Sequence, residues 1–362
     1  MRILEKYILK DFISSFLFCV VLLMVLGVIG DVLGFMDDIF KNNIPLSSIL
    51  AFYAYLAPFA FVNMVPFAAL LSAAYVFNSL SKNHEITAVI ASGLSLWKLL
   101  RPVLLVMLLV CIAVFIVNDR VVPSTMRKAE QIRSEDLESG NKGREKVITN
   151  LAVYGKGGQI IFAKSYLPEQ STLTDVIIHK QDENHRVMKK INARQVKYQG
   201  DGVWQGSDVI MFGLDEKGDF TGDPEIYKTK DLEIRETPSE LSKSQWDPKF
   251  MSYKQLKKYL SVFNVESPVA IRRLLVDLNY KLAFPFTALI TVIICVPFSI
   301  ETGRANALVG MVRGITIGML YVPVMAVSLA LGKAGVFPPI AAAWLSNALF
   351  AILGVYYIYK KS

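Results

Sequence analysis

The stretch FISSFLFCVVLLMVLGVIG, residues 12–30, decides the architecture of this chain, because it contains no charged residue over a length that crosses a lipid bilayer. The hydrocarbon core of a membrane takes about 20 mostly apolar residues of helix. A second charge-free stretch follows, NNIPLSSILAFYAYLAPFAFVNMVPFAALLSAAYVFNSLS, residues 42–81. Its proline at position 45 predicts a bent entry, and Pro58 and Pro66 predict kinks within one span near Ala51–Leu80.

Four further apolar runs complete a set of six predicted spans, arranged in two groups of three. They are Pro102–Asn118, Leu282–Ile300, Gly314–Gly332 and Ala334–Tyr359. The composition agrees, since 53% of the residues are hydrophobic. All three cysteines lie inside apolar runs, so the polar middle of the chain has neither a disulfide framework nor a cysteine zinc site.

The positive charges beside the spans predict their orientation. They cluster before the first span, between the second and third, between the fourth and fifth, and after the sixth, which are all on one side of the membrane. These residues are Arg2, Lys6 and Lys10; Lys82, Lys98 and Arg101; Arg304 and Arg313; Lys360 and Lys361. Lysine and arginine stay on the cytoplasmic side of a membrane protein. We therefore expect both termini in the cytoplasm and residues 119–276 outside it. Much of the net charge of +8 lies beside the spans, where lysine and arginine orient a membrane protein, so we do not predict nucleic-acid binding.

The N-terminal charges recur every four residues, while Ile3, Leu4, Tyr7 and Ile8 fall on another face. This pattern predicts either a short interfacial helix on the cytoplasmic leaflet or a plain cytoplasmic flank.

The polar middle of the chain changes to the period of β-strands. Short runs rich in β-branched and aromatic residues alternate with turn clusters such as Gly155–Gly158 and Gly200–Gly202. These runs predict an antiparallel sandwich or jelly roll at about residues 146–250, entered by a helix near Val122–Glu138 and left by a helix near Ser252–Phe263 with Ser252 as N-cap. The predicted domains are residues 1–118 (first membrane half), 119–276 (periplasmic domain) and 277–362 (second membrane half).

Catalytic signatures are missing from the sequence. It has no P-loop, G-x-S-x-G, H-E-x-x-H or C-x-x-C motif, so we predict a non-catalytic protein whose energy comes from a partner. His179 and His185 stand near turn residues, and we expect them to be solvated. The loop His84–Gly93, at about residues 82–96, is a short apolar helix with one carboxylate near its start. It suits docking into another protein's groove and, equally, lying on the membrane surface.

Four short segments carry a resemblance to a known family. They are HEITAVIASG at 84–93; DLNYKL at 277–282 with Pro285 and VPFS at 296–299; FPP at 337–339; and EKYI at 5–8. In this order they resemble the lipopolysaccharide export permeases LptF/LptG, with FPP favouring the G type. The likeness covers essentially the whole chain.

The resemblance implies a transport subunit of an ABC transporter. A paired permease (LptF or LptG), a cytoplasmic LptB dimer that binds ATP and Mg, the single-span LptC and a periplasmic LptA bridge would be its partners. No cofactor is expected in this chain. Lipopolysaccharide would enter from the inner membrane between the first span of one permease and the fifth of the other, and its acyl chains would pass into the jelly roll.

The resemblance also assigns candidate residues. The coupling contact to the ATPase would involve Glu85, Ile86, Val89, Ser92 and Gly93. The lipid head group would meet Lys41 and Arg133, although Asp31 and Glu130 depart from basic family positions, which would leave the paired subunit to supply most cations. The acyl-chain path would be lined by Phe162, Ile178, Trp204, Ile210 and Phe212, whose alternative role is ordinary strand core.

Other functions remain open on the sequence alone. A permease for another amphipathic envelope lipid would show the same spans. A membrane-bound envelope enzyme would need clustered carboxylates or histidines at a membrane boundary, where Asp31, Asp37 and Asp38 form the one such cluster, without a base or metal partner. A scaffold that links an ATPase to the envelope would also fit.

Overall fold

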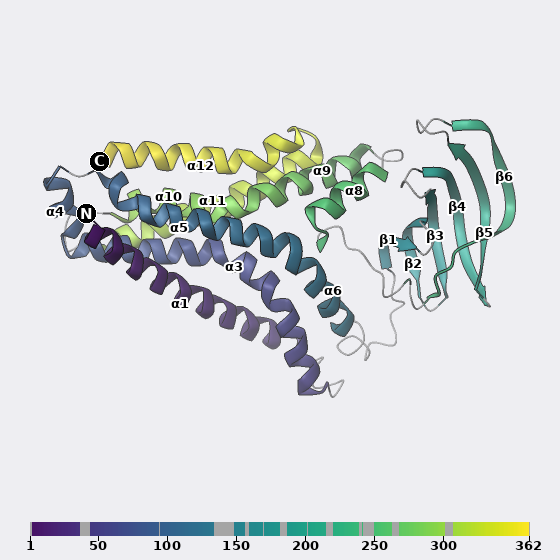
Figure 1. Cartoon of the computed structure of the whole chain (residues 1–362), viewed down its shortest axis with the longest axis horizontal. Coiled ribbons are helices and arrows are strands. Elements are labelled where there is room, and N and C mark those ends of the chain that lie inside the picture. Colours follow the sequence, from purple (N-terminus) through teal and green to yellow (C-terminus); the bar gives the residue numbers. More distant parts are fainter. Residues whose placement is uncertain are drawn as a thin grey trace. The chain divides into compact units, whose positions relative to one another are not determined.

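A computed structural model describes residues 2–36, 44–93, 95–133, 148–155, 159–168, 170–181, 187–200, 202–214, 220–238, 241, 250–262, 268–300 and 307–361. The chain divides into two compact units (Figure 1). The helical unit is Met1–Ala129 with Met251–Ser362, and the β unit is Glu130–Phe250. The β unit is thus an insertion in the middle of the helical unit.

The helices before the insertion begin with two long spans. The elements are α1 (Arg2–Gly34), α3 (Leu46–Lys82), the short α4 (Glu85–Ala91), α5 (Leu96–Ile116), the π-helical turn η1 (Val117–Val121) and α6 (Val122–Ile132). Helix α3 contains Pro58 and Pro66 without ending, and it begins directly after Pro45. A π-helical turn inside a helix lets the run from α5 into α6 continue with one extra residue per turn.

The first residues do not form a separate interfacial helix, because α1 is continuous from Arg2 to Gly34. Ile8, Phe12, Phe16 and Val20 are buried and recur every four residues, so one apolar stripe runs from the first turns into the span. Packing of that stripe against α3 and α5 keeps the first turns on the axis of the span.

The helices after the insertion are α8 (Tyr253–Val262), α9 (Pro268–Ala283), the 3₁₀ turn η4 (Phe284–Phe286), α10 (Thr287–Ser299), α11 (Ala307–Ala334) and α12 (Pro339–Lys361). The predicted capping residue at α8 is confirmed: Ser252 Oγ accepts from the Gln255 backbone N–H at 3.2 Å, and Gln255 Oε1 accepts from the Ser252 N–H at 2.9 Å. Asp119 in η1 accepts a further hydrogen bond from the Tyr253 N–H at 2.5 Å.

In the part of the chain that the structure describes, six helical segments are long and apolar enough to span a membrane, which confirms the predicted helical membrane fold. The helices extend beyond most of the expected spans, and the third runs from Leu96 to Ile132 instead of Pro102–Asn118. The starts of the fourth and sixth spans differ for identifiable reasons. The fourth span is α9–η4–α10, because Pro285 converts the join into a 3₁₀ turn without ending the rod. The sixth span begins at Pro339, because Gly335 adopts φ +95° after α11 and the Val336 N–H bonds back to the Leu331 carbonyl at 2.9 Å.

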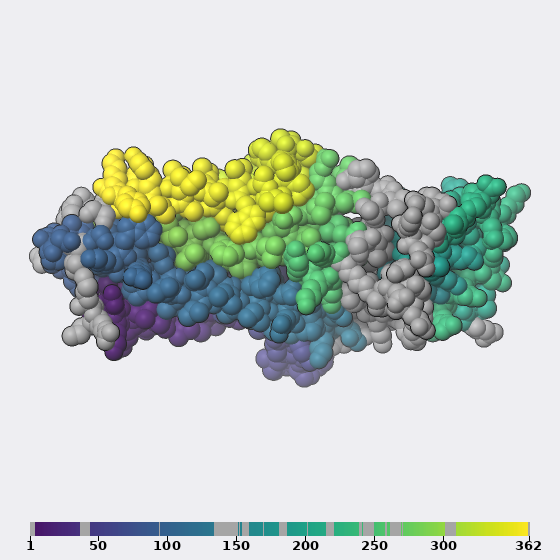
Figure 2. Space-filling model, turned by 45° about the horizontal axis from the view of Figure 1, so that its top comes forward, coloured from purple at the N-terminus to yellow at the C-terminus, as the bar shows by residue number. Residues whose placement is uncertain are grey.

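Helix α10 is the centre of the helical unit, and it packs against α3, α5, α11 and α12. In Figure 2, α12 (yellow) and α5 (blue) flank the green segments, while α1 (purple) lies at the edge. Two-thirds of the most apolar stretch of the fourth span (67%) is buried, compared with 17% for α1 and 22% for α11. The spans therefore differ greatly in how much protein covers them.

Helix α11 is fastened to its neighbours by small and polar residues. A Cβ on Gly314 would meet Ser299 and lie 3.1 Å from the Cys295 carbonyl of α10, and Gly318 lies as closely over Leu70 of α3. Small residues let membrane helices approach closely. The Ser328 hydroxyl donates to the Ala342 carbonyl of α12 at 2.7 Å.

A buried hydrogen-bond network joins α11 to three other elements. The Tyr321 hydroxyl donates to Asn347 Oδ1 of α12 at 2.5 Å and lies 3.1 Å from the Thr287 hydroxyl of α10. The Asn347 amide donates in turn to the Ala283 carbonyl at the end of α9 at 2.9 Å. Nearer the end of α11, Lys333 forms an ion pair with Asp277 of α9 at 2.6 Å. These contacts make α9–α12 one interlocked group.

The described residues of the inserted β domain form one antiparallel sheet whose six strands pair in sequence order. They are β1 (Ile148–Gly155), β2 (Gln159–Leu167), β3 (Thr172–Gln181), β4 (Val187–Gly200), β5 (Val203–Leu214) and β6 (Phe220–Leu232). The predicted insertion of an antiparallel β domain between helices is confirmed. Among the described strands the connectivity is a meander of hairpins, rather than the crossing connections of Greek keys, because each turn cluster is short enough to pair neighbouring strands.

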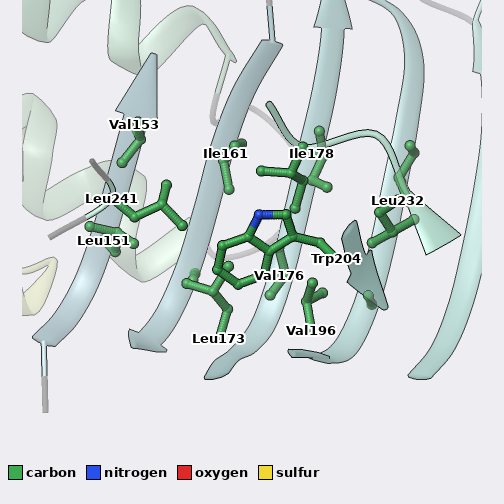
Figure 3. Close-up of a cluster of buried hydrophobic side chains, with 14 of the residues drawn as sticks. Leu151, Val153, Ile161, Leu173, Val176, Ile178, Val196, Trp204, Leu232 and Leu241 are labelled. Carbon is green, nitrogen blue, oxygen red and sulfur yellow. The ribbon is translucent and has the colours of Figure 1, made fainter. Parts of the chain in front are cut away.

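One face of the sheet holds a continuous hydrophobic core. Trp204 is completely buried at its centre, among Val176, Val196 and Leu232 (Figure 3). The Trp204 indole donates to the Glu236 carbonyl at 2.8 Å, and the Tyr166 hydroxyl donates to the Pro238 carbonyl at 3.0 Å. The segment after β6 is thereby held against the core, and Leu241 covers it.

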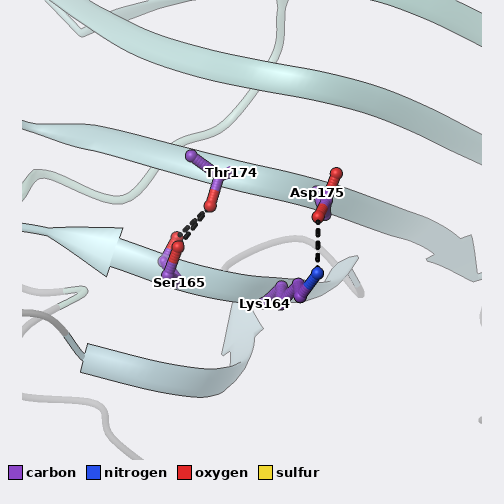
Figure 4. A network of polar contacts seen from close by, with 4 residues as sticks. All are labelled: Lys164, Ser165, Thr174 and Asp175. Atoms are coloured by element: carbon purple, nitrogen blue, oxygen red, sulfur yellow. Dashed lines mark hydrogen bonds and ion pairs between the residues drawn. The ribbon is translucent and has the colours of Figure 1, made fainter.

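A row of four charged residues crosses the sheet from β2 to β5, and we call this row the crease. Lys164, Asp175, Arg194 and Asp208 stand in one row on β2 to β5, and Lys164–Asp175 and Arg194–Asp208 are ion pairs at 3.4 and 3.9 Å. Asp175 and Asp208 have positive φ. The next row begins with the hydrogen-bonded hydroxyls of Ser165 and Thr174 (Figure 4).

On the two sides of the crease, the core-facing residues of β2 to β5 change between odd and even positions in the sequence. In β3 the core residues are Leu173, then Val176 and Ile178, and in β4 they are Ala193 and then Val196. A regular strand would place residues two apart on the same face. The three-residue step at the crease keeps both halves of each strand facing the same core.

Candidate functional site

The first candidate site is the short helix α4, which connects the two spans α3 and α5. Helix α4 lies at the same end of the helical unit as both termini (Figure 1). His84 precedes it in the left-handed region at φ 59°, and Gly93 follows it at φ 79°. The Asn83 amide donates to Glu85 Oε1 at 3.4 Å, and the Ser92 hydroxyl donates to the Val89 carbonyl at 2.7 Å. The helix is therefore bounded by two sharp changes of backbone direction.

The five residues assigned to α4 do not all face outward. Ile86 is buried, with 2% of its surface exposed, so its side chain anchors the helix to its own chain. Glu85 and Val89 are half-buried, while Ser92 and Gly93 are exposed. A partner that approached this end of the molecule would meet the other four residues and not Ile86.

The ends of three spans, α3, α5 and α12, lie near α4. Helix α3 runs into α4 and packs against it, and α5 begins immediately after it. The Trp97 ring of α5 lies 5.7 Å from the Tyr359 ring of α12. Through this contact the two halves of the helical unit meet beside α4.

The second candidate site is the uncovered apolar surface of α1 and α11. In α1 the exposed residues include Leu17, Phe18, Leu26 and Leu33, with more than half of each side chain accessible. In α11 Val312, Met319 and Leu320 are exposed to a similar extent. Aliphatic surface of this kind on membrane helices faces lipid or another membrane helix.

The residues assigned to a lipid head group are placed only in part. Lys41 lies outside the described residues, and Arg133 follows the last residue of α6. Asp31 on α1 accepts a hydrogen bond from the Tyr53 hydroxyl of α3 at 2.8 Å. Glu130 is exposed on α6. The sequence analysis missed Lys128, whose ammonium lies 5.1 Å from the centre of the Tyr55 ring; the polar face of α6 was the available signal.

The five residues assigned to an acyl-chain path lie on both faces of the sheet. Ile178 and Trp204 belong to the closed core. Phe162 and Ile210 lie on the other face, in the row Phe162–Ile177–Asn192–Ile210, and Phe212 stands in the next row of that face. Phe162 is buried, while Ile210 and Phe212 are half-buried.

His179 is buried, which corrects the expectation that it is solvated. Only 7% of its surface is exposed, and its ring meets Phe162 edge-on at 6.0 Å. Its neighbour across the strands is Lys190, which is also buried. The expectation failed because nearness to a turn in sequence does not show which face of a strand is covered. His185 lies outside the described residues.

The described residues contain six apolar helical segments of bilayer length, and an antiparallel β domain is inserted between the third and the fourth along the chain. These features define a polytopic membrane protein with a large extramembrane insertion. The family model described as lipopolysaccharide export system permease LptF/LptG matches residues 6–360, and the chain belongs to this family. The chain is similar to the lipopolysaccharide export system permease protein LptG of Haemophilus influenzae, at 21% identity over 356 residues, which is 97% of this chain and 96% of that protein. The resemblance drawn from the short motifs is confirmed.

Proposed function

We propose that this chain is one permease subunit of an ABC exporter, which extracts lipopolysaccharide from the inner membrane and passes it to a periplasmic bridge. The observation that carries the proposal is the low coverage of α1 and α11, both long enough to span the bilayer. These uncovered sides would meet the fifth and first spans of a paired permease, LptF or LptG. A cavity closed by such pairs would open sideways to lipid.

The ATPase partner would bind at α4. The charge distribution beside the spans supports a cytoplasmic location for α4 and both termini, and a periplasmic location for the β domain. The sequence has no P-loop, so ATP and Mg would be bound by an LptB dimer. Glu85, Val89, Ser92 and Gly93 would contact it, and Ile86 would hold the helix in place. LptC and the LptA bridge would complete the route.

The acyl-chain path would follow the sheet face opposite the Trp204 core. On this face Phe162, Ile210 and Phe212 share one side of the crease, and Ile226 in the same row has 72% of its surface exposed. An acyl chain cannot cross water freely, since each CH₂ exposed there costs about 0.8 kcal/mol. Ile178 and Trp204 would support this face from behind without touching lipid.

Photocrosslinking tests the lipid route. A photoreactive amino acid at Leu26 of α1 or Met319 of α11 is expected to form adducts with lipopolysaccharide or with the paired permease, because both positions are on uncovered spans. Ile352 of α12 is an equally exposed apolar control. Immunoblots for lipopolysaccharide and for the partner would score the adducts. Equal lipopolysaccharide labelling at Ile352, or no adduct with either lipopolysaccharide or the paired permease at Leu26 and Met319, would contradict the route.

Substitution of Glu85 tests the ATPase contact. Glu85→Ala is expected to weaken ATPase binding by roughly tenfold, the scale of one lost charged hydrogen bond at an interface, and Glu85→Lys by more. The variant should fold normally, because the hydrogen bond from Asn83 to Glu85 is exposed. Co-purification of the ATPase measures the effect, with Glu5→Ala at the start of α1 as the carboxylate control. An unchanged yield of ATPase with Glu85→Lys would rule out the contact.

A further inference from the structure

The two halves of α1 are held differently. Ile8, Phe12, Phe16 and Val20 form a buried stripe along the first half. In the second half, from Val21 to Met36, every residue is exposed or half-buried. The first half of α1 therefore has a continuous apolar anchor, and the second half lies against its neighbour without one.

The second half of α1 is also loosely packed and rich in glycine. Gly27, Gly30 and Gly34 fall within eight residues. A Cβ added to Gly30 or Gly34 would meet nothing within 4 Å, and one added to Gly27 would just touch Met64 at 3.8 Å. Glycine in a helix interior costs about 1 kcal/mol relative to alanine, because the backbone gains freedom when the helix opens. This segment is therefore the easier part of α1 to bend.

A polar contact ties this loose segment to α3. The Tyr53 hydroxyl donates to Asp31 Oδ2 at 2.8 Å, and Asp31 is the one charged residue of α1 after Asp11. A carboxyl group in a membrane span requires a partner, so this bond opposes separation of the helices. Tyr53 is half-buried, and its ring meets that of the buried Phe52 edge-on at 5.2 Å.

Helix α3 also contacts α6, two residues beyond Tyr53. Tyr55 lies under the Lys128 ammonium of α6 at 5.1 Å. Residues two apart on a helix point to nearly opposite sides, so Tyr53 and Tyr55 face different neighbours. The same turn of α3 thus holds α1 on one side and α6, the helix that leads into the β unit, on the other.

We propose that Asp31 and Tyr53 form a releasable latch. With the hydrogen bond made, the second half of α1 lies against α3. When it breaks, that half bends away at the glycine-rich segment while the buried stripe keeps the first half in place. The latch is a property of this chain and goes beyond the proposed transport function, so failure of lipid crosslinking would leave it standing.

Spin-label distances test the latch in the full chain in lipid nanodiscs. With Cys19, Cys111 and Cys295 replaced by alanine, one label pair is placed at Leu33 and Leu50 to report on the second half of α1. A second pair at Ile13 and Tyr75 reports on the first half. All four positions are exposed. Double electron–electron resonance gives the distance distribution of each pair.

The variant Tyr53→Phe removes the hydroxyl alone. It is expected to raise the population of long Leu33–Leu50 distances by roughly tenfold, since one hydrogen bond shifts an equilibrium by about that factor. The Ile13–Tyr75 distances should not change. Asp31→Asn retains an oxygen that accepts from Tyr53 and should keep the short distances. The exposed Tyr356→Phe on α12 serves as the matched control.

Three results would overturn the latch. The first is an unchanged Leu33–Leu50 distribution in Tyr53→Phe, which would mean that other contacts hold α1. The second is release in Asp31→Asn as complete as in Tyr53→Phe. The third is equal broadening at Ile13–Tyr75, which would indicate general loosening of the helices instead of bending of one half.

Discussion

Helices α1 and α11 are the two least covered spans, yet they are attached in opposite ways. Helix α11 contacts α3, α9, α10 and α12, and it is joined to them by close glycine packing, an ion pair and the Tyr321 network. Helix α1 packs on α3 and α5 through one buried apolar stripe that ends at Val20, and beyond it α1 is joined to α3 by the Asp31–Tyr53 hydrogen bond. A span with little of its surface buried can therefore be held along its whole length, as α11 is, or mainly along one half, as α1 is. The buried fraction alone does not distinguish the two cases.

The largest expected effect comes from a side chain added to α11. Gly314→Leu must displace α11 from α10, because even a Cβ there would meet Ser299 and lie 3.1 Å from the Cys295 carbonyl. We expect a loss of about 3 kcal/mol in the free energy of unfolding, at the upper end for overpacking. Gly30→Leu in α1 is the matched control, because nothing lies within 4 Å of its Cβ position. Unfolding in detergent titrated with SDS, followed by circular dichroism, measures both. Similar losses in the two variants would remove the contrast between the helices.

A smaller effect is expected at the buried network. Tyr321→Phe leaves Asn347 Oδ1 without its donor at a site where both side chains are less than 5% exposed. The expected cost is about 1.5 kcal/mol, since hydrogen bonds between membrane helices contribute modestly. The same SDS titration measures it, with the exposed Tyr356→Phe as control. If Tyr321→Phe were as stable as the parent, the network would not fasten α11.

The smallest effect is expected at the ion pair between α9 and α11. Lys333 and Asp277 are each about one-third exposed, so Lys333→Met should cost only about 0.5 kcal/mol. The double variant with Asp277→Asn should lose little more than either single variant if the pair acts as a unit. Fully additive losses in a double-mutant cycle would show that the two charges stabilise the protein independently.

The sequence predicted the membrane fold because charge-free runs of bilayer length have few other solutions. The ends of helices were less certain: the turn at Gly335 and the start of α12 at Pro339 depend on one left-handed residue that a hydropathy pattern does not see. The Tyr321 network had a signal in the polar residues Thr287 and Asn347 within apolar spans, but these two residues lie 34 and 26 positions from their partner Tyr321. Such pairing follows only from the packing of the helices.

The β faces were beyond reach of the sequence for a different reason. Strand alternation places residues two apart on one face, whereas the crease shifts that alternation in several strands at once. Trp204 and Phe212 are an even number apart and were grouped together, yet the shift at Asp208 places them on opposite faces. The alternation of residues along a strand does not show at which residue the inward-facing positions change from odd to even.

The crease also makes the β unit sensitive to chain length in an unusual way. Removing Asp175 alone would restore an ordinary zigzag in β3, with Leu173 two residues from Val176 and still facing the Trp204 core. Residues 172–174 would then be displaced by one position against the strands on either side, so that Thr174 would no longer lie opposite Ser165. Loss of the matching residue from every strand would be needed to recover a consistent sheet. The charged row therefore marks the position at which all of these strands change their inward-facing residues together. An insertion or deletion there is compatible with the sheet only if every strand that carries the row changes by the same number of residues.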